Sequence, residues 1–204
     1  MKTFSHAVLA SVLALFLLPA HLCAVTLDWD AVTWTAGSLS NSYDIDPSRA
    51  GNDITVTVTG NTSQFQNSNA TPNVLTPAIT NRDQGGLTPA ELSLTLAVDF
   101  TNRTESVTTT VNFSALYAQG VQNVSFTIFD VDFQNAGGSQ YQDQLRSITA
   151  IAVDGSIVAP TITVSPNNSL SGAGVNQVVT GNVTHFGSIA SAGYGLTIDN
   201  WRAG

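Results

Sequence analysis

Residues 126–151 read FTIFDVDFQNAGGSQYQDQLRSITAI, and they combine features that recur along the chain. An apolar stretch ends in two aspartates, a segment rich in Gly and Gln follows, and a third aspartate precedes another apolar stretch. Side chains alternate between the two faces of a strand, so Phe126 should share a face with Asp130 and Asp132. Phe129 lies on the opposite face and is also apolar, which predicts a central strand covered on both sides.

Alternation with period two recurs on both sides of this stretch, with threonine and β-branched residues that suit a pleated sheet. Turn sequences such as GN, DG, PNN and SGAG separate the runs. This pattern predicts an all-β chain, folded as a single antiparallel β-sandwich of jelly-roll type over residues 25–204. The runs are VTLDWDAVTW (25–34), DITVTVTG (53–60), LSLTLAVDF (92–100), SVTTTVNF (106–113), NVSFTIFDVDF (123–133), RSITAIAV (146–153), NQVVTGNVT (176–184) and YGLTIDNW (194–201).

Two segments fall outside this alternation. Residues 63–90 are polar and contain prolines, which predicts a surface excursion of the kind that often carries binding residues. The loop FQNAGGSQYQ, residues 133–142, is expected to connect two strands without secondary structure of its own.

The first 24 residues have the layout of a secretory signal peptide. Lys2 is followed by an apolar stretch at residues 8–18, and Ala24 is a suitable last residue before cleavage. The apolar stretch is too short for a stable membrane span. We therefore predict a secreted or cell-surface protein whose mature chain has no membrane span. The alternatives are a buried N-terminal helix and a lipid anchor on Cys23.

Composition excludes several functional classes. Residues 25–204 contain all fourteen acidic residues, five arginines and no lysine or cysteine, which gives them a net charge of −9. Neutralising phosphates needs a basic surface, so we expect neither nucleic acid nor anionic membranes as partners. Disulfides, thiolate metal sites, Schiff-base chemistry and multi-histidine zinc sites are excluded as well.

Acid–base catalysis by carboxylates is the remaining route to an enzyme. Glycoside hydrolysis needs two carboxyl groups, one with a raised pKa. The glutamates, Glu91 and Glu105, both lie in expected turns rather than in strands rich in Trp and Tyr. A Ser/His/Asp triad would have to use His185, and no G-x-S-x-G motif accompanies it. We therefore predict a non-catalytic protein.

The aspartates of the opening stretch are candidate cation ligands. Ca²⁺ binds six to eight oxygens, from carboxylates and from backbone carbonyls. Asp130 and Asp132 are predicted to end one strand, and Asp143 precedes the next. Asp130, Asp132 and Asp143 therefore predict a structural Ca²⁺ site. The alternative is a set of solvated loop acids. A second candidate set is Asp28, Asp30 and Asp199, whose alternative is the wet face of an edge strand.

Residues 92–204 resemble a β-sandwich domain of exported Gram-negative surface proteins of the PEP-CTERM class. The likeness rests on a D-[IV]-D motif in VSFTIFDVDF, on the later aspartate and G-x-x-V turn in YQDQLRSITAIAVDGSIVAPT, and on the closing strand YGLTIDNWRAG. The family's C-terminal Pro-Glu-Pro motif, apolar helix and arginines are missing here. The resemblance implies a surface or extracellular location and leaves the activity open.

These observations favour an extracellular protein that binds glycan or matrix, or that is purely structural. The expected partner is an extracellular polysaccharide. The alternative from another class is a small jelly-roll hydrolase or lyase that acts on polysaccharide. Exposed aromatic rings on a concave face would favour glycan binding, and the candidates are Trp34, Tyr43, Tyr141 and Trp201.

Overall fold

Alternating β-branched and polar residues form several of the strands, as β2 (Ile54–Gly60) illustrates. Ile54, Val56 and Val58 are buried on one face, whereas Thr55 and Thr57 between them are half-buried on the other. Valine, isoleucine and threonine fit a pleated surface because their branched side chains pack against neighbouring strands. The same composition extends over most of the other strands.

The structure is a computed structural model, and it describes residues 24–82, 91–136, 139–182 and 195–203. Short 3-10 helices interrupt the strands at Thr62–Gln64 (η1), Ala115–Tyr117 (η2) and Gly174–Asn176 (η3). The other strands are β1 (Ser40–Tyr43), β3 (Ala78–Thr80), β4 (Ser93–Thr95), β5 (Val107–Phe113), β6 (Val121–Phe129), β7 (Phe133–Ala136), β8 (Ser139–Gln142), β9 (Gln144–Arg146), β10 (Ala150–Ile151), β11 (Ile157–Val158), β12 (Thr161–Val164), β13 (Asn168–Ser171), β14 (Val178–Gly181) and β15 (Gly195–Ala203).

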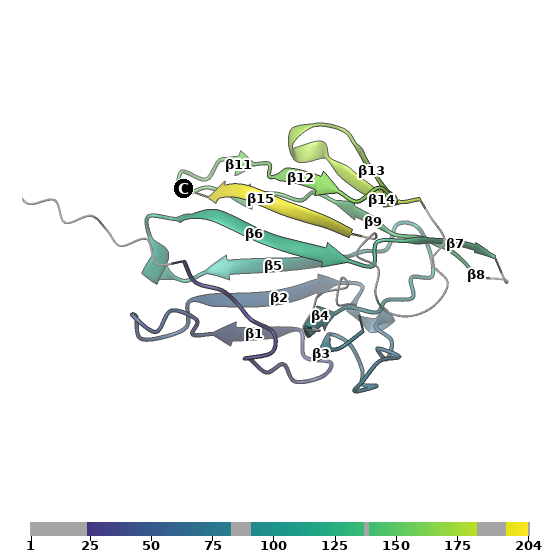
Figure 1. Ribbon diagram of the computed structural model, residues 1–204, viewed down its shortest axis with the longest axis horizontal. Coiled ribbons are helices and arrows are strands. Elements are labelled where there is room, and N and C mark those ends of the chain that lie inside the picture. The colour runs from purple at the N-terminus through teal and green to yellow at the C-terminus, as the bar shows by residue number, and fades with distance from the viewer. Residues whose placement is uncertain (1–23, 83–90, 137–138, 183–194, 204) are drawn as a thin grey trace, which may run out of the picture.

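Within the described residues the strands pair antiparallel in six small sheets. Three sheets have three strands each, in the orders β1-β2-β5, β12-β15-β6 and β13-β14-β9. The others are the two-stranded pairs β3-β4, β7-β8 and β10-β11. In Figure 1 the strands of the first two sheets run along the long axis of the molecule.

Two buried clusters form the core. One lies under the N-terminal sheet and is built on Trp34, Tyr43, Ile54 and Val56. The other lies under the C-terminal strands and is built on Val131, Ile162 and Val179. Each cluster draws on residues that are distant in sequence, so burial of apolar surface ties the small sheets to one another.

The predicted all-β class is confirmed, but three local predictions are wrong. Within the described residues β6 is an edge strand of its sheet rather than a central strand covered on both sides, and its Phe126 is 38% exposed. Residues 25–34 are irregular rather than a strand. Their apolar side chains Leu27, Trp29 and Val32 instead pack against the N-terminal core cluster. The predicted loop at 133–142 is a hairpin, β7-β8, because its polar residues pair through their backbones. The sandwich or jelly-roll arrangement remains a prediction.

No helix in the described ranges is both long and apolar enough to cross a membrane. The predicted signal peptide lies in residues 1–24, of which 1–23 fall outside the described residues.

Candidate functional site

The chain between β6 and β9 carries the three aspartates that the sequence predicts as cation ligands. β6 ends at Phe129, and Asp130 has a positive φ of 58°. This left-handed conformation interrupts the strand, so the expected alternation between Asp130 and Asp132 does not hold. Asp130 is half-buried, whereas Asp132 is only 4% exposed.

The hairpin β7-β8 returns the chain so that Asp143 meets Asp132. The backbone N–H of Asp143 donates to the Asp132 carbonyl at 2.9 Å. The backbone N–H of Asp132 donates to Oδ2 of Asp143 at 3.3 Å. The hydroxyl of Tyr141, at the end of the hairpin, donates to Oδ2 of Asp132 at 3.2 Å. Two of the three predicted ligands are thus held in direct contact.

Burial and neighbouring charge change the acidity of this group. The pKa of Asp143 is raised to about 7. Burial raises it most, the charges of Asp132 and Asp130 raise it further, and the hydrogen bond from the Asp132 N–H lowers it. Burial, followed by the charge of Asp132, also raises the pKa of Tyr141. The Tyr141 hydroxyl therefore remains a hydrogen-bond donor at neutral pH.

Gly181 at the end of β14 lies directly against this pair. Its N–H donates to the Asp143 carbonyl at 3.1 Å, and its carbonyl accepts from Nε2 of Gln142 at 2.9 Å. A Cβ atom at Gly181 would collide with the backbone of Asp132. The glycine is needed because another backbone passes so close to it.

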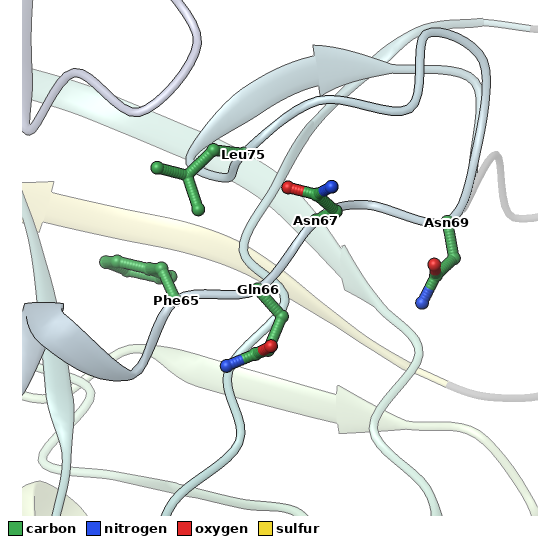
Figure 2. Close-up of a pocket in the computed structure, with 5 residues that line it drawn as sticks. All are labelled: Phe65, Gln66, Asn67, Asn69 and Leu75. Carbon is green, nitrogen blue, oxygen red and sulfur yellow. The ribbon is translucent and has the colours of Figure 1, made fainter.

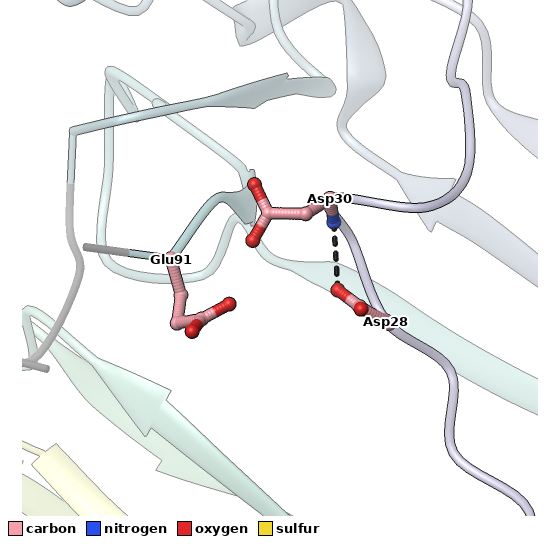
Figure 3. Close-up of side chains that lie close together, drawn as sticks. All are labelled: Asp28, Asp30 and Glu91. Atoms are coloured by element: carbon pink, nitrogen blue, oxygen red, sulfur yellow. Dashed lines mark hydrogen bonds between the residues drawn. The ribbon is translucent and has the colours of Figure 1, made fainter. Parts of the chain in front are cut away.

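Asp28 and Asp30 of the second acidic set lie close together, and Glu91 lies with them. Oxygens of Asp28, Asp30 and Glu91 all lie within 4.8 Å of one another, and within the described residues these three form the acidic group with that spacing (Figure 3). Asp28 Oδ1 accepts from the N–H of Asp30 at 2.9 Å. Asp30 Oδ2 accepts from the N–H of Leu92 at 3.2 Å, which holds the Glu91 segment beside it.

Glu91, which the sequence did not predict for this set, joins Asp28 and Asp30. A hydrogen bond with Asp30 raises the pKa of Glu91, followed by burial and by the charges of Asp30 and Asp28. The side chain of Asp199 lies outside the described residues, and its backbone pairs with Thr161 of β12. The cluster joins segments about 60 residues apart in sequence, so no local motif could have revealed it.

A hollow of about 320 Å³ lies on the polar excursion that follows β2. Figure 2 shows its lining residues, which are Phe65, Gln66, Asn67, Asn69 and Leu75. Three of these five side chains are amides, and none is charged. The three amide residues are exposed, as is Leu75, while Phe65 is 8% exposed.

Buried hydroxyls fix the backbone around this hollow. Thr76 Oγ1 donates to the Gln66 carbonyl at 2.9 Å and accepts from the N–H of Ala97 at 3.0 Å. Ser68 is fully buried, and its Oγ donates to the Pro72 carbonyl at 2.8 Å. A short bridge pairs Asn67 with Leu75. These hydrogen bonds and this bridge fix the backbone on both sides of the hollow.

The amide groups around this hollow remain available to a ligand. Gln66 Nε2 donates to the Gln64 carbonyl at 3.2 Å, which leaves its Oε1 as an acceptor. Within the described part of the chain, the side-chain amides of Asn67 and Asn69 make no hydrogen bond. Each amide offers both donors and acceptors.

Two of the four aromatic residues named as candidate glycan platforms, Trp34 and Tyr43, do not lie on a surface. Trp34 is 8% exposed and Tyr43 is 6% exposed, and both belong to the N-terminal core cluster. Tyr141 is exposed but bonded to Asp132. The side chain of Trp201, like His185, lies outside the described residues.

A comparison of the chain with protein-family models, curated proteins and solved structures finds no match. The resemblance to exported PEP-CTERM-class proteins therefore remains a prediction.

Proposed function

We propose that the protein is a non-catalytic, exported binding protein for neutral extracellular glycan. The hollow at Phe65, Gln66, Asn67, Asn69 and Leu75 is the observation that supports this function most directly. Amide side chains can both donate to and accept from sugar hydroxyls. Phe65 and Leu75 offer apolar surface for the C–H faces of a sugar ring, so the lining suits a small number of placed polar groups on an apolar base.

Charge narrows the class of glycan. No charged side chain lines the hollow, and residues 25–204 carry a net charge of −9. The net negative charge would oppose an anionic polysaccharide. Arg82 lies beside the hollow, where its guanidinium donates to the Ser68 carbonyl, but it is not one of the lining residues. The proposed ligand is therefore a neutral polysaccharide. The predicted β-sandwich would be the scaffold that carries the hollow.

Binding can be tested with immobilised neutral and anionic polysaccharides. We expect the neutral ones to bind and the double variant Gln66→Ala, Asn67→Ala to bind at least about tenfold more weakly, because each lost hydrogen bond is worth about 1 kcal/mol. Gln119→Ala removes an exposed amide elsewhere and should bind normally. Equal binding by the double variant and by the native chain would contradict the assignment of this hollow.

Export is part of the same proposal and has its own test. Cleavage after Ala24 should leave a mature chain that begins at Val25. Intact-mass measurement of the protein recovered outside the cytoplasm checks this prediction. Retention of Met1, or a lipid on Cys23, would contradict it.

One observation favours the hydrolase as a second candidate. Glu91 has a raised pKa beside Asp30, as a general acid next to a carboxylate would. Retaining glycosidases hold their two carboxyl groups about 5–5.5 Å apart, whereas inverting enzymes hold them farther apart. Release of reducing sugar that is lost in Glu91→Gln would establish this activity and replace the non-catalytic proposal.

A further inference from the structure

β5 has a long outer edge that lacks a partner strand within the described residues. Its inner edge pairs with β2 along the whole strand, from Val107 opposite Gly60 to Phe113 opposite Ile54. β6 is drawn next to β5 in the projection of Figure 1, but β6 pairs with β15 and belongs to another sheet. An open edge of this kind is a template for another strand.

The register identifies which groups face outward. The N–H of Ser114 donates to the Asp53 carbonyl at 2.8 Å, and the N–H of Asn61 donates to the Ser106 carbonyl at 2.9 Å. Hydrogen-bonded pairs alternate along an antiparallel ladder, so every second residue between Ser106 and Ser114 also bonds to β2. The N–H and C=O groups of the residues between them therefore point to the open edge. These are Val107, Thr109, Val111 and Phe113.

The side chains of these four residues lie on the face that β2 buries. Val111 is opposite Val56, which is 2% exposed, yet Val111 itself is 48% exposed. Phe113 is 38% exposed opposite Ile54, which is 4% exposed. The core thus covers β2 but leaves Val111 and Phe113 partly exposed, although the Phe113 ring contacts the ring of Tyr117.

The strand lacks the usual devices that block an edge. VTTTVNF contains no charged residue and no proline, in a protein with a net charge of −8. Natural edge strands are commonly protected by lysine, proline or a bulge. Two copies of this strand would meet without like-charge repulsion.

We propose that the open edge of β5 pairs with β5 of a second copy of this chain. A two-fold axis through Thr110 places Val107 opposite Phe113 of the second copy, and Thr109 opposite Val111 of the second copy. These pairs unite residues whose backbone groups all point outward, and they give about eight hydrogen bonds across the axis. The two three-stranded sheets then form one six-stranded sheet, with the apolar side chains of both β5 strands on one face.

This register also suits the polar face. Thr110 lies on the axis opposite its own copy, and Thr108 lies opposite Asn112, which allows cross-strand side-chain hydrogen bonds. Pairing through one strand buries less than the roughly 1,200–2,000 Å² of a standard interface, so the dimer should be weak and concentration-dependent.

A single introduced cysteine tests both the pairing and its register. The full chain with Cys23→Ser has no other cysteine. Adding Thr110→Cys places two thiols opposite each other across the axis, within the Cα separation that a disulfide accepts. Adding Thr108→Cys instead places the two thiols four residues apart along the strands, about 13 Å, which is too far.

We expect oxidation to give at least about tenfold more disulfide-linked dimer with Thr110→Cys than with Thr108→Cys. Sedimentation of the unsubstituted chain should show its average mass rising between about 1 and 100 µM, as for a weak interface. A chain that stays monomeric over this range would overturn the proposal and favour closure of β5 onto its own β6. Equal crosslinking at both positions would exclude this register.

Discussion

At the scale of single residues, Asp143 shows how position changes the chemistry of a carboxyl group. The Asp132 N–H stabilises its ionised form, but burial and the charges of Asp132 and Asp130 oppose ionisation more strongly. The pKa of Asp143 rises from the ordinary 3.8 to about 7 as a result. A proton on Asp143 relieves the repulsion between the two carboxylates.

The pH dependence of stability follows from this shift. Below about pH 3.8, Asp143 holds its proton in both the folded and the unfolded chain. As pH rises, the unfolded chain releases the proton first, so this contribution to stability is lost progressively up to about pH 7. In the presence of a chelator, the stability of Asp143→Asn relative to the native chain should therefore increase as pH rises between these two values.

Thermal unfolding at several pH values measures this difference. Asp99→Asn removes an exposed carboxylate by the same chemical change and serves as the matched control. A difference between Asp143→Asn and the native chain that is the same at pH 4 and pH 7 would refute the shifted pKa.

The limits of sequence-based prediction are also visible at this scale. Alternation correctly placed Phe126 and Ile128 in a strand, and it placed Asp132 and Asp143 at neighbouring strand ends. It failed at Asp130, because a positive φ at a non-glycine residue leaves no periodic signal. The contact of Glu91 with Asp30 depends on tertiary packing, which local patterns do not encode.

At the scale of elements, one buried carboxylate fastens the β1–β2 connection to η2. Asp53 is fully buried, and its Oδ2 accepts from the N–H groups of Ile45 at 2.7 Å and Asp46 at 2.6 Å. Its Oδ1 accepts from the Tyr117 hydroxyl at 3.1 Å. Arg49 strengthens the connection by pairing with Asp46 at 3.3 Å and by lying 4.9 Å from the centre of the Tyr117 ring.

These donors keep Asp53 ionised despite its burial. Burial raises the pKa of Asp53, but the N–H groups of Asp46 and Ile45, the Tyr117 hydroxyl and the charge of Arg49 together lower it below its ordinary value. The stabilisation that Asp53 supplies is present above the ordinary pKa and is lost as pH falls through the lowered value.

Removing this carboxylate should be costly. Asp53→Ala leaves two backbone N–H groups and a hydroxyl without their acceptor, so we expect the free energy of unfolding to fall by about 3 kcal/mol. Tyr117→Phe removes one of the three bonds and should cost about 1 kcal/mol. Urea unfolding measures both values. Equal losses for the two variants would show that the backbone bonds to Asp53 contribute nothing.

The elements differ in how far the sequence revealed them. β2, β5 and β6 were predicted from alternation, and the structure confirms each. Residues 25–34 alternate as well but form no strand, and their apolar side chains Leu27, Trp29 and Val32 are half-buried against the core without a pairing partner. The excursion at 63–90 was predicted as a surface segment, but its hollow depends on buried hydroxyls at Ser68 and Thr76 that have no sequence motif.

At the scale of the whole molecule, a negatively charged chain must be stabilised without disulfides. Residues 25–204 carry a net charge of −9, and their acidic residues gather both at Asp28, Asp30 and Glu91 and at Asp132 and Asp143. Like charges held close together destabilise the folded state, and the unfolded chain relieves that repulsion. A divalent cation bound only by the folded chain would reverse this effect.

We expect Ca²⁺ to raise the thermal midpoint through the Asp132–Asp143 pair. At a hundredfold excess over the dissociation constant, binding adds about 2.7 kcal/mol, or roughly 5–10 °C for a chain of this size. The gain should grow between pH 6 and pH 8, because Asp143 must lose its proton to become a ligand and its pKa is about 7. Differential scanning calorimetry with Ca²⁺ and then with chelator measures the shift.

Two matched variants show which of the two acidic groups binds the Ca²⁺ that raises the thermal midpoint. Asp132→Asn keeps the side-chain oxygen that accepts from Tyr141 but removes a charge from the Asp132–Asp143 pair, so the Ca²⁺-dependent part of the shift should disappear. Asp30→Asn removes a charge from the group with Asp28 and Glu91 and should leave the shift in place. If Asp30→Asn abolishes the shift instead, the ion binds at the N-terminal group. An identical midpoint with Ca²⁺ and with chelator would mean that neither group binds the ion, and that Asp132 and Asp143 are held together by their backbone hydrogen bonds and by the proton on Asp143.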